Sequence, residues 1–127
     1  MTYTFSKTLD MDFDQAIERV TEELKKEGFG VLTEIDVQAT LKKKINVDFR
    51  KYRILGACNP GFAHKALEAE PEIGTMLPCN VIVQEADSGV RVSAIDPMAS
   101  MQAVENADLG AVATQVQDKL RNVINNL

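Results

Sequence analysis

Residues with reactive side chains are concentrated in one third of this chain. Both cysteines, the only histidine and all four prolines of the 127 residues lie between positions 56 and 101. Cys58 is followed directly by Asn59, and Cys79 is followed directly by Asn80, so each thiol stands beside a side-chain amide. Amides orient ligands through hydrogen bonds, and thiols bind soft metals or exchange disulfides, so the sequence predicts a site in this segment.

The two thiols are open to a metal-binding and a structural interpretation. His64, one turn into a predicted helix, and Met98 would add the imidazole and thioether groups that zinc or copper(I) accepts, which makes Cys58, Cys79, His64 and Met98 the metal candidates. The alternative is that no cofactor binds. Free cysteine is among the most buried residue types, and the chain has no Cys-x-x-Cys or His-x-x-x-His spacing.

The charge balance argues against several classes of partner. Lys and Arg total 14 against 19 Asp and Glu, so the net charge of −5 provides no attraction to nucleic acid or to an anionic membrane. The first residues lack the pattern of a signal peptide, and no apolar run reaches the roughly 20 residues of a membrane span. We therefore expect one cytoplasmic domain, residues 1–127, whose cysteines remain thiols.

Two long helices are predicted from apolar residues that repeat every three or four positions. The first begins at Asp12, where Gln15 completes a capping pattern, and it ends near Gly28. The second carries an apolar stripe from Leu109 to Leu127. Each helix has a single apolar face, so both must pack against another layer.

Strands and short helices account for the rest of the chain. Strands are predicted for residues 3–9, 29–37, 52–58, 81–83 and 90–95, the last two joined by a tight turn at residues 87–89. Residues 38–46 form either a short helix capped by Asp36 or a lysine-bearing edge strand. Asn59-Pro60 begins another short helix, capped by Asn59. The order strand, helix, four strands, helix predicts an α+β fold of two layers, with an antiparallel sheet and two main helices on one face.

Four motifs follow one another in the chain. Residues 56–60 read Gly-Ala-Cys-Asn-Pro, residues 63–67 read Ala-His-Lys-Ala-Leu, residues 77–81 read Leu-Pro-Cys-Asn-Val, and Asp96 precedes Pro97. With the order of elements, they resemble the family catalogued as domain of unknown function 302, over nearly the whole chain. The resemblance implies a curved antiparallel sheet with two helices, similar to the TATA-binding-protein class, and a homodimer. It implies no activity.

The predicted strand ends suggest where a site would form. If the strand that ends at Cys58 is the antiparallel neighbour of the strand that begins near Cys79, the two thiols approach each other at one edge of the sheet. The candidate ligand-binding residues are therefore Cys58, Asn59, Cys79, Asn80 and Asp96.

Three functions follow from these residues. The leading hypothesis is a small dimeric domain that is not an enzyme and binds a small ligand or partner in a crevice at the strand ends, with Ala57, Phe62 and Leu77 as apolar walls. A second is a copper(I), zinc or thiol-redox protein that uses Cys58 and Cys79. A third is an assembly domain whose functional part is its dimer surface.

Overall fold

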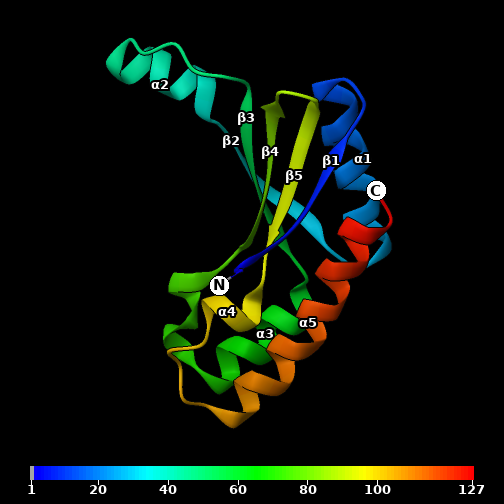
Figure 1. Cartoon of the computed structure of the whole chain (residues 1–127). Helices are drawn as coiled ribbons and strands as arrows, with labels where there is room; N and C mark the ends of the chain where they lie inside the picture. Colours follow the sequence, from blue (N-terminus) through cyan, green and yellow to red (C-terminus); the bar gives the residue numbers. More distant parts are fainter. Residues whose placement is uncertain (1) are drawn as a thin grey trace.

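Five antiparallel strands form one curved sheet, shown in Figure 1 for a computed structural model that describes residues 2–127. The order across the sheet is β1-β5-β4-β3-β2. The strands are β1 (Thr4–Leu9), β2 (Gly30–Asp36), β3 (Tyr52–Cys58), β4 (Cys79–Ala86) and β5 (Gly89–Ile95). All of the predicted strands are confirmed, with β4 beginning two residues earlier than expected. Every neighbouring pair is antiparallel, as the α+β prediction requires.

Helices occupy three positions around the sheet (Figure 1). The long helices α1 (Phe13–Lys26) and α5 (Ala107–Asn125) cover one face. The short elements α3 (Pro60–Ala69), η1 (Pro71–Met76) and α4 (Pro97–Ser100) gather at one end, and α2 (Val37–Ile45) projects from the other. The two main helices on one face confirm the predicted two-layer arrangement, and α4 is an additional turn of helix.

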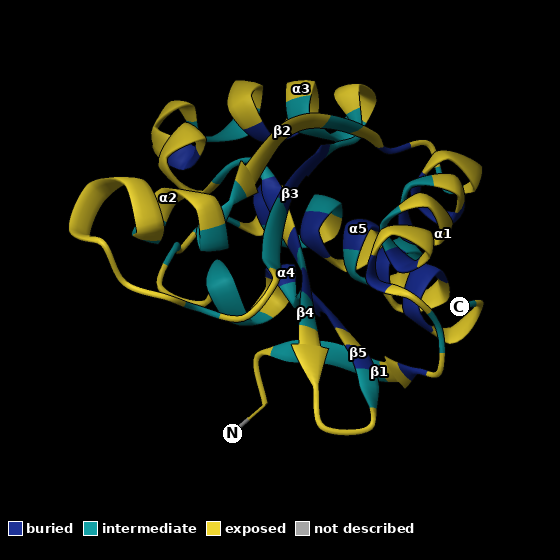
Figure 2. Ribbon diagram, turned by 90° about the horizontal axis from the view of Figure 1, so that it is seen from above, coloured by how far each residue is buried: buried dark blue, intermediate teal, exposed yellow. Residues whose placement is uncertain are grey.

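The core lies between the sheet and the two long helices. Alternate residues of the central strands, such as Val81 and Val83 in β4 and Val92 in β5, are completely buried. They pack against helix residues that include Val20 and Leu120. Figure 2 shows the buried faces of α1 and α5 turned toward the strands. Alternation in the strands and a three-to-four repeat in the helices therefore produce one shared apolar interface.

The ends of α1 differ in how closely they follow the prediction. Asp12 occupies the N-cap position, but its side chain accepts no capping hydrogen bond, so the predicted capping box is wrong. The C-terminal prediction is confirmed: Gly28 adopts a φ of 87°, which glycine reaches without steric cost. Its N–H donates to the carbonyl of Lys25, and that of Phe29 donates to Leu24, which forms a Schellman motif.

Helix α2 is an arm with little support from the rest of the chain. Asp36 caps it by accepting a hydrogen bond of 2.9 Å from the N–H of Ala39, so the helical interpretation is confirmed and the edge strand is wrong. No residue of α2 is buried. Its capping and its contacts with β2 and β3 therefore hold it in place, rather than any burial in the core.

An irregularity in β2 shapes the sheet near the end of β3. Val31 pairs with Ala57 and Thr33 pairs with Gly56, so Leu32 is an extra residue in a β-bulge. Bulges redirect side chains, and Leu32 is 69% exposed. A Cβ on Gly56 would lie 2.1 Å from Oγ1 of Thr33 and 2.7 Å from Cγ of Pro78, so glycine is required there by close packing.

We predict that Gly56→Ala destabilises the protein by about 1–3 kcal/mol, because the added methyl group displaces two packed neighbours. Urea unfolding followed by circular dichroism measures the change. Gly61→Ala is the control, since nothing lies within 4 Å of a Cβ at that helical position. Equal stability of the Gly56→Ala variant and the parent would contradict the packing argument.

Candidate functional site

The candidate site lies where β3 ends and β4 begins. Ala57 of β3 pairs with Cys79 of β4, so the two strands are antiparallel neighbours as the sequence predicted. Between them, α3 and η1 fold back over this end of the sheet (Figure 1). Helix α5 packs against α3 and closes the other side. Elements from both halves of the chain therefore surround one space.

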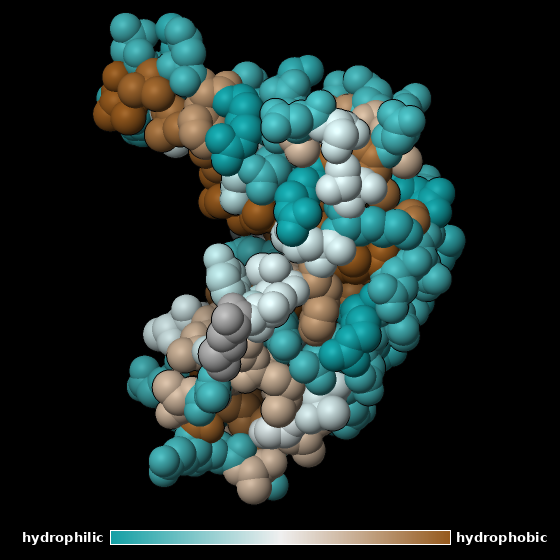
Figure 3. Space-filling view, viewed as in Figure 1, coloured by the Kyte–Doolittle hydropathy of each residue, from teal (hydrophilic) through white to brown (hydrophobic). Residues whose placement is uncertain are grey.

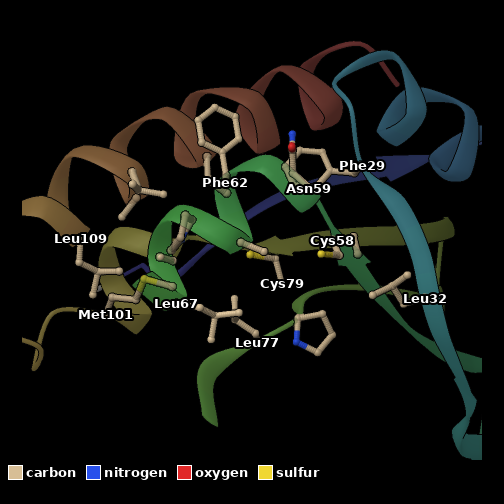
Figure 4. A pocket seen from close by; sticks show the side chains of 18 residues that line it. Phe29, Leu32, Cys58, Asn59, Phe62, Leu67, Leu77, Cys79, Met101 and Leu109 are labelled. Atoms are coloured by element: carbon tan, nitrogen blue, oxygen red, sulfur yellow. The ribbon is translucent and has the colours of Figure 1, made fainter. Parts of the chain in front are cut away.

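This space is a cavity of about 300 Å³ that is lined almost entirely by apolar side chains (Figure 4). Its eighteen lining residues come from six parts of the chain: Phe29 and Leu32; Ala57, Cys58 and Asn59; Phe62, Ala63, Ala66 and Leu67; Leu77, Pro78 and Cys79; Pro97 and Met101; and Leu109, Val112, Ala113 and Val116. None of these side chains carries a formal charge at neutral pH. The predicted apolar walls Ala57, Phe62 and Leu77 are all among them.

Asn59 is the one amide among the lining residues. It occupies the N-cap position of α3, but its side chain makes no capping hydrogen bond, so the predicted cap is wrong. Its Nδ2 instead donates to the carbonyl of Glu27 at 3.2 Å, and the same atom lies 3.1 Å from where a Cβ on Gly28 would be. This bond turns the amide toward the end of α1. In Figure 4 the Asn59 side chain accordingly points away from Cys58 and Cys79.

Both cysteines line the cavity, and both are free thiols. Cys79 is buried, whereas Cys58 is partly exposed. Burial, with a smaller contribution from the neighbouring Cys58, raises the pKa of the Cys79 thiol from 9.0 to about 11. Desolvation disfavours the thiolate, so Cys79 is a neutral, weakly polar part of the wall at physiological pH.

Two of the other candidate residues, Asn80 and Asp96, lie outside the cavity. Asn80 is exposed and follows Cys79 in the strand, so it belongs to the opposite face of the sheet. The Oδ1 of Asp96 accepts hydrogen bonds from the N–H of Met98 and from Gln117, each at 3.0 Å, and thereby caps α4 and ties it to α5. The sequence predicts that Asp96 binds a ligand together with the cysteines, but the structure does not bring it to the thiols.

The predicted metal ligands are also separated. The side chain of His64 is 76% exposed and pairs with Glu68 on the outer surface of α3. Met98 lies near Thr114, away from the cavity, whereas Met101 is the methionine that lines it. Within residues 2–127, no three His, Cys, Asp or Glu side chains form a group that could hold a metal ion. The described part of the chain thus brings together the thiols but not the four proposed ligands.

The contribution of α5 was not visible in the sequence. Leu109, Val112, Ala113 and Val116 form one wall of the cavity, yet their spacing indicated only an apolar helix face. Small side chains were a signal that could have been used. Ala63 and Ala66 on α3 and Ala113 on α5 all line the space, and alanines at such positions leave volume that leucines would fill.

The comparisons with known proteins agree with this architecture. The family model described as domain of unknown function DUF302 matches residues 5–127. A crystal structure of an uncharacterized conserved DUF302 protein from Bacillus stearothermophilus is similar, with a TM-score of 0.91 and 26% identity over 98% of each chain. The comparison with curated proteins gave no match.

The fold and cavity define a two-layer α+β domain with an apolar pocket at the ends of two central strands. The chain belongs to the DUF302 family, as its motifs suggested. Among the helices of residues 2–127, none has the length and apolar composition needed to cross a membrane.

We predict that Cys79 reacts slowly with iodoacetamide. In a Cys58→Ser variant the contribution of Cys58 is lost, but burial, the larger cause, still raises the pKa of Cys79, so the rate constant for alkylation at pH 8 falls by about tenfold or more relative to the unfolded chain. Mass spectrometry over time measures it, with the variant unfolded in urea as the control. Equal alkylation rates in the folded and unfolded protein would refute the raised pKa of the Cys79 thiol.

The same shift predicts a pH dependence of stability. Between pH 9 and 11 the unfolded chain releases the Cys79 proton while the folded chain retains it, so the free energy of unfolding falls as the pH rises through this window. Urea unfolding at a series of pH values tests this. In Cys79→Ala the free energy of unfolding should fall less over this pH range. A pH profile identical to that of the parent protein would contradict the role of Cys79.

Proposed function

We propose that this protein is a binding domain that holds an uncharged, largely apolar small molecule in the strand-end cavity and catalyses no reaction on it. The observation that carries the proposal is the cavity itself, about 300 Å³ lined by eighteen residues of which none is charged. Ligand pockets are typically of this size and character, with few polar groups that fix orientation. Here the lining has one amide, Asn59, whose Nδ2 already donates to the carbonyl of Glu27.

The apolar lining of the cavity favours a neutral ligand over an ionic one. Moving a charged group from water into apolar surroundings is costly unless a partner charge compensates. The ammonium groups of Lys65 and Lys119 lie 5.6 and 5.9 Å from the centre of the Phe62 ring, but neither lysine lines the cavity. A neutral, largely apolar molecule fits this lining.

The groups needed for catalysis are poorly placed for this cavity. A cysteine nucleophile requires its thiolate, and the raised pKa of Cys79 keeps that thiol protonated. The imidazole of His64 lies on the outer surface of α3, where it pairs with Glu68 at 3.2 Å, so it does not serve the thiols as a base. These placements favour binding over chemistry.

We predict that N-phenyl-1-naphthylamine, a neutral fluorescent probe with one N–H donor, binds the protein with increased emission. Ala63→Phe should weaken binding at least tenfold, because the larger side chain occupies the cavity. His64→Phe is the matched control: the same residue type is introduced one position along, on the exposed side of α3.

Fluorescence titration gives both dissociation constants, and thermal unfolding checks that each variant folds. No binding by the parent protein, or equal weakening in the two variants, would overturn the proposal. Retained binding in His64→Phe with loss in Ala63→Phe would support it.

A second function, assembly of a homodimer, is favoured by the uncovered α2 arm. Ile45 at its end is 63% exposed, and the following Val47 is 41% exposed. Figure 3 shows apolar side chains on this arm above a hollow in the molecular surface. The open face of the sheet has a hollow of about 430 Å³ with a mixed lining, in which Ile82 and Ile95 stand beside polar residues such as Arg91. We propose that a second copy covers the apolar arm and this hollow.

The charge distribution agrees with a second copy as the occupant. Helix α2 carries Lys42, Lys43 and Lys44 and no acidic residue, whereas the whole chain has a net charge of −5. The arm of one copy is thus attracted to the acidic remainder of another.

We predict that the parent protein is dimeric by light scattering after size exclusion and that Ile45→Glu shifts it to the monomer, because a carboxylate cannot be buried without a partner. Ala111→Glu, on the exposed surface of α5, is the control and should remain dimeric. A monomeric parent protein would eliminate this candidate without affecting the cavity.

A further inference from the structure

A second cavity adjoins the candidate site at the end away from Leu32. It has a volume of about 240 Å³ and lies between α4, the turn that follows it and α5. Met101, Leu109 and Ala113 line both cavities. Figure 4 places Met101 and Leu109 together at that end of the first cavity. Three side chains thus form a shared wall between two spaces.

Two of the three wall residues are fixed by their packing. Leu109 is 2% exposed and packs against Ala66 and Ile73 in a small apolar cluster. Ala113 is buried in the middle of α5 and has no side-chain torsion to change. Neither can move aside without displacing the helix that carries it.

Met101 differs from both. It is partly exposed and lies just after α4, so its side chain has an open side. Its backbone is held, because its N–H donates to the carbonyl of Pro97 and its own carbonyl accepts from Val104, both at 3.0 Å. The thioether side chain is unbranched and changes conformation at little cost. Motion at the wall is therefore a change in the Met101 side chain alone.

We infer that Met101 is a movable wall and that the two cavities form one elongated site for a neutral molecule with a linear apolar tail. This inference rests on the proposed binding function. The tail runs along Ala66 and past Met101. The second cavity has the apolar Val104 and the exposed Gln102 in its wall, so the end of a long tail comes near solvent.

The ligand class follows from the lining of the two cavities. The first is lined almost entirely by apolar side chains, the second adds the amides of Gln102 and Asn106, and no charged residue lines either cavity. A long-chain primary alcohol, with one uncharged hydroxyl group and a chain of methylene groups, matches this lining. Each methylene buried in an apolar site strengthens binding about fourfold.

Displacement of N-phenyl-1-naphthylamine by a series of primary alcohols, from hexanol to tetradecanol, tests the inference. In the parent protein, affinity should rise about fourfold per methylene and continue to rise for tails too long for the first cavity alone. Met101→Leu conserves volume but is branched and stiffer, so its affinity should stop rising at a shorter chain length. Met101→Ala opens the wall and should bind the longest alcohols at least as tightly as the parent.

Met76→Ala is the control, because Met76 lines neither cavity. It should reproduce the chain-length profile of the parent protein. If the probe binds but all four proteins stop gaining affinity at the same chain length, the movable wall is refuted while the binding function stands. If the probe does not bind the parent protein, the binding function itself fails. Thermal unfolding confirms that the variants are folded.

Discussion

The pairing of β3 with β4 is the constraint on which the rest of the structure depends. Ala57 lies opposite Cys79, which fixes where one strand ends and the other begins. The chain between them must leave the sheet, reverse and return within a short span, and it does so as α3 and η1. Gly56 allows Thr33 and Pro78 to approach closely beside this pairing. A side chain there would push apart the strands that frame the cavity.

The cavity is a consequence of small side chains at this reversal. Ala57, Ala66 and Ala113 are nearly inaccessible, yet they leave space that larger apolar residues would occupy. Replacing a buried leucine by alanine costs typically 2–5 kcal/mol, so unfilled volume in a core reduces stability. A ligand that binds only the folded state restores the missing contacts and offsets that loss. An apolar ligand is thus the occupant whose binding follows from the same forces that fold the chain.

Most of the fold could be predicted from the sequence, whereas only part of the site could. The helices and strands follow from their 3.6- and 2-residue periods, whereas the sequence leaves the pairing of the strands at Cys58 and Cys79 as an assumption. Asn80 is a candidate beside Cys79, but consecutive residues in a strand point to opposite faces, so the structure places it on the other face of the sheet. The actual partner of Asn59, the carbonyl of Glu27, was not visible, because it lies 32 residues away and depends on how α1 ends.

The structure changes what the two thiols signify. In the sequence, their position among a histidine, methionines and polar residues leaves metal or redox chemistry open as the alternative to the packing role that free cysteines usually have. In the folded chain His64 faces outward, Asp96 is committed to Met98 and Gln117, and burial keeps Cys79 protonated. What remains around the thiols is apolar surface. Such a site discriminates by shape and apolar contact, since it lacks the charges needed to select an ion.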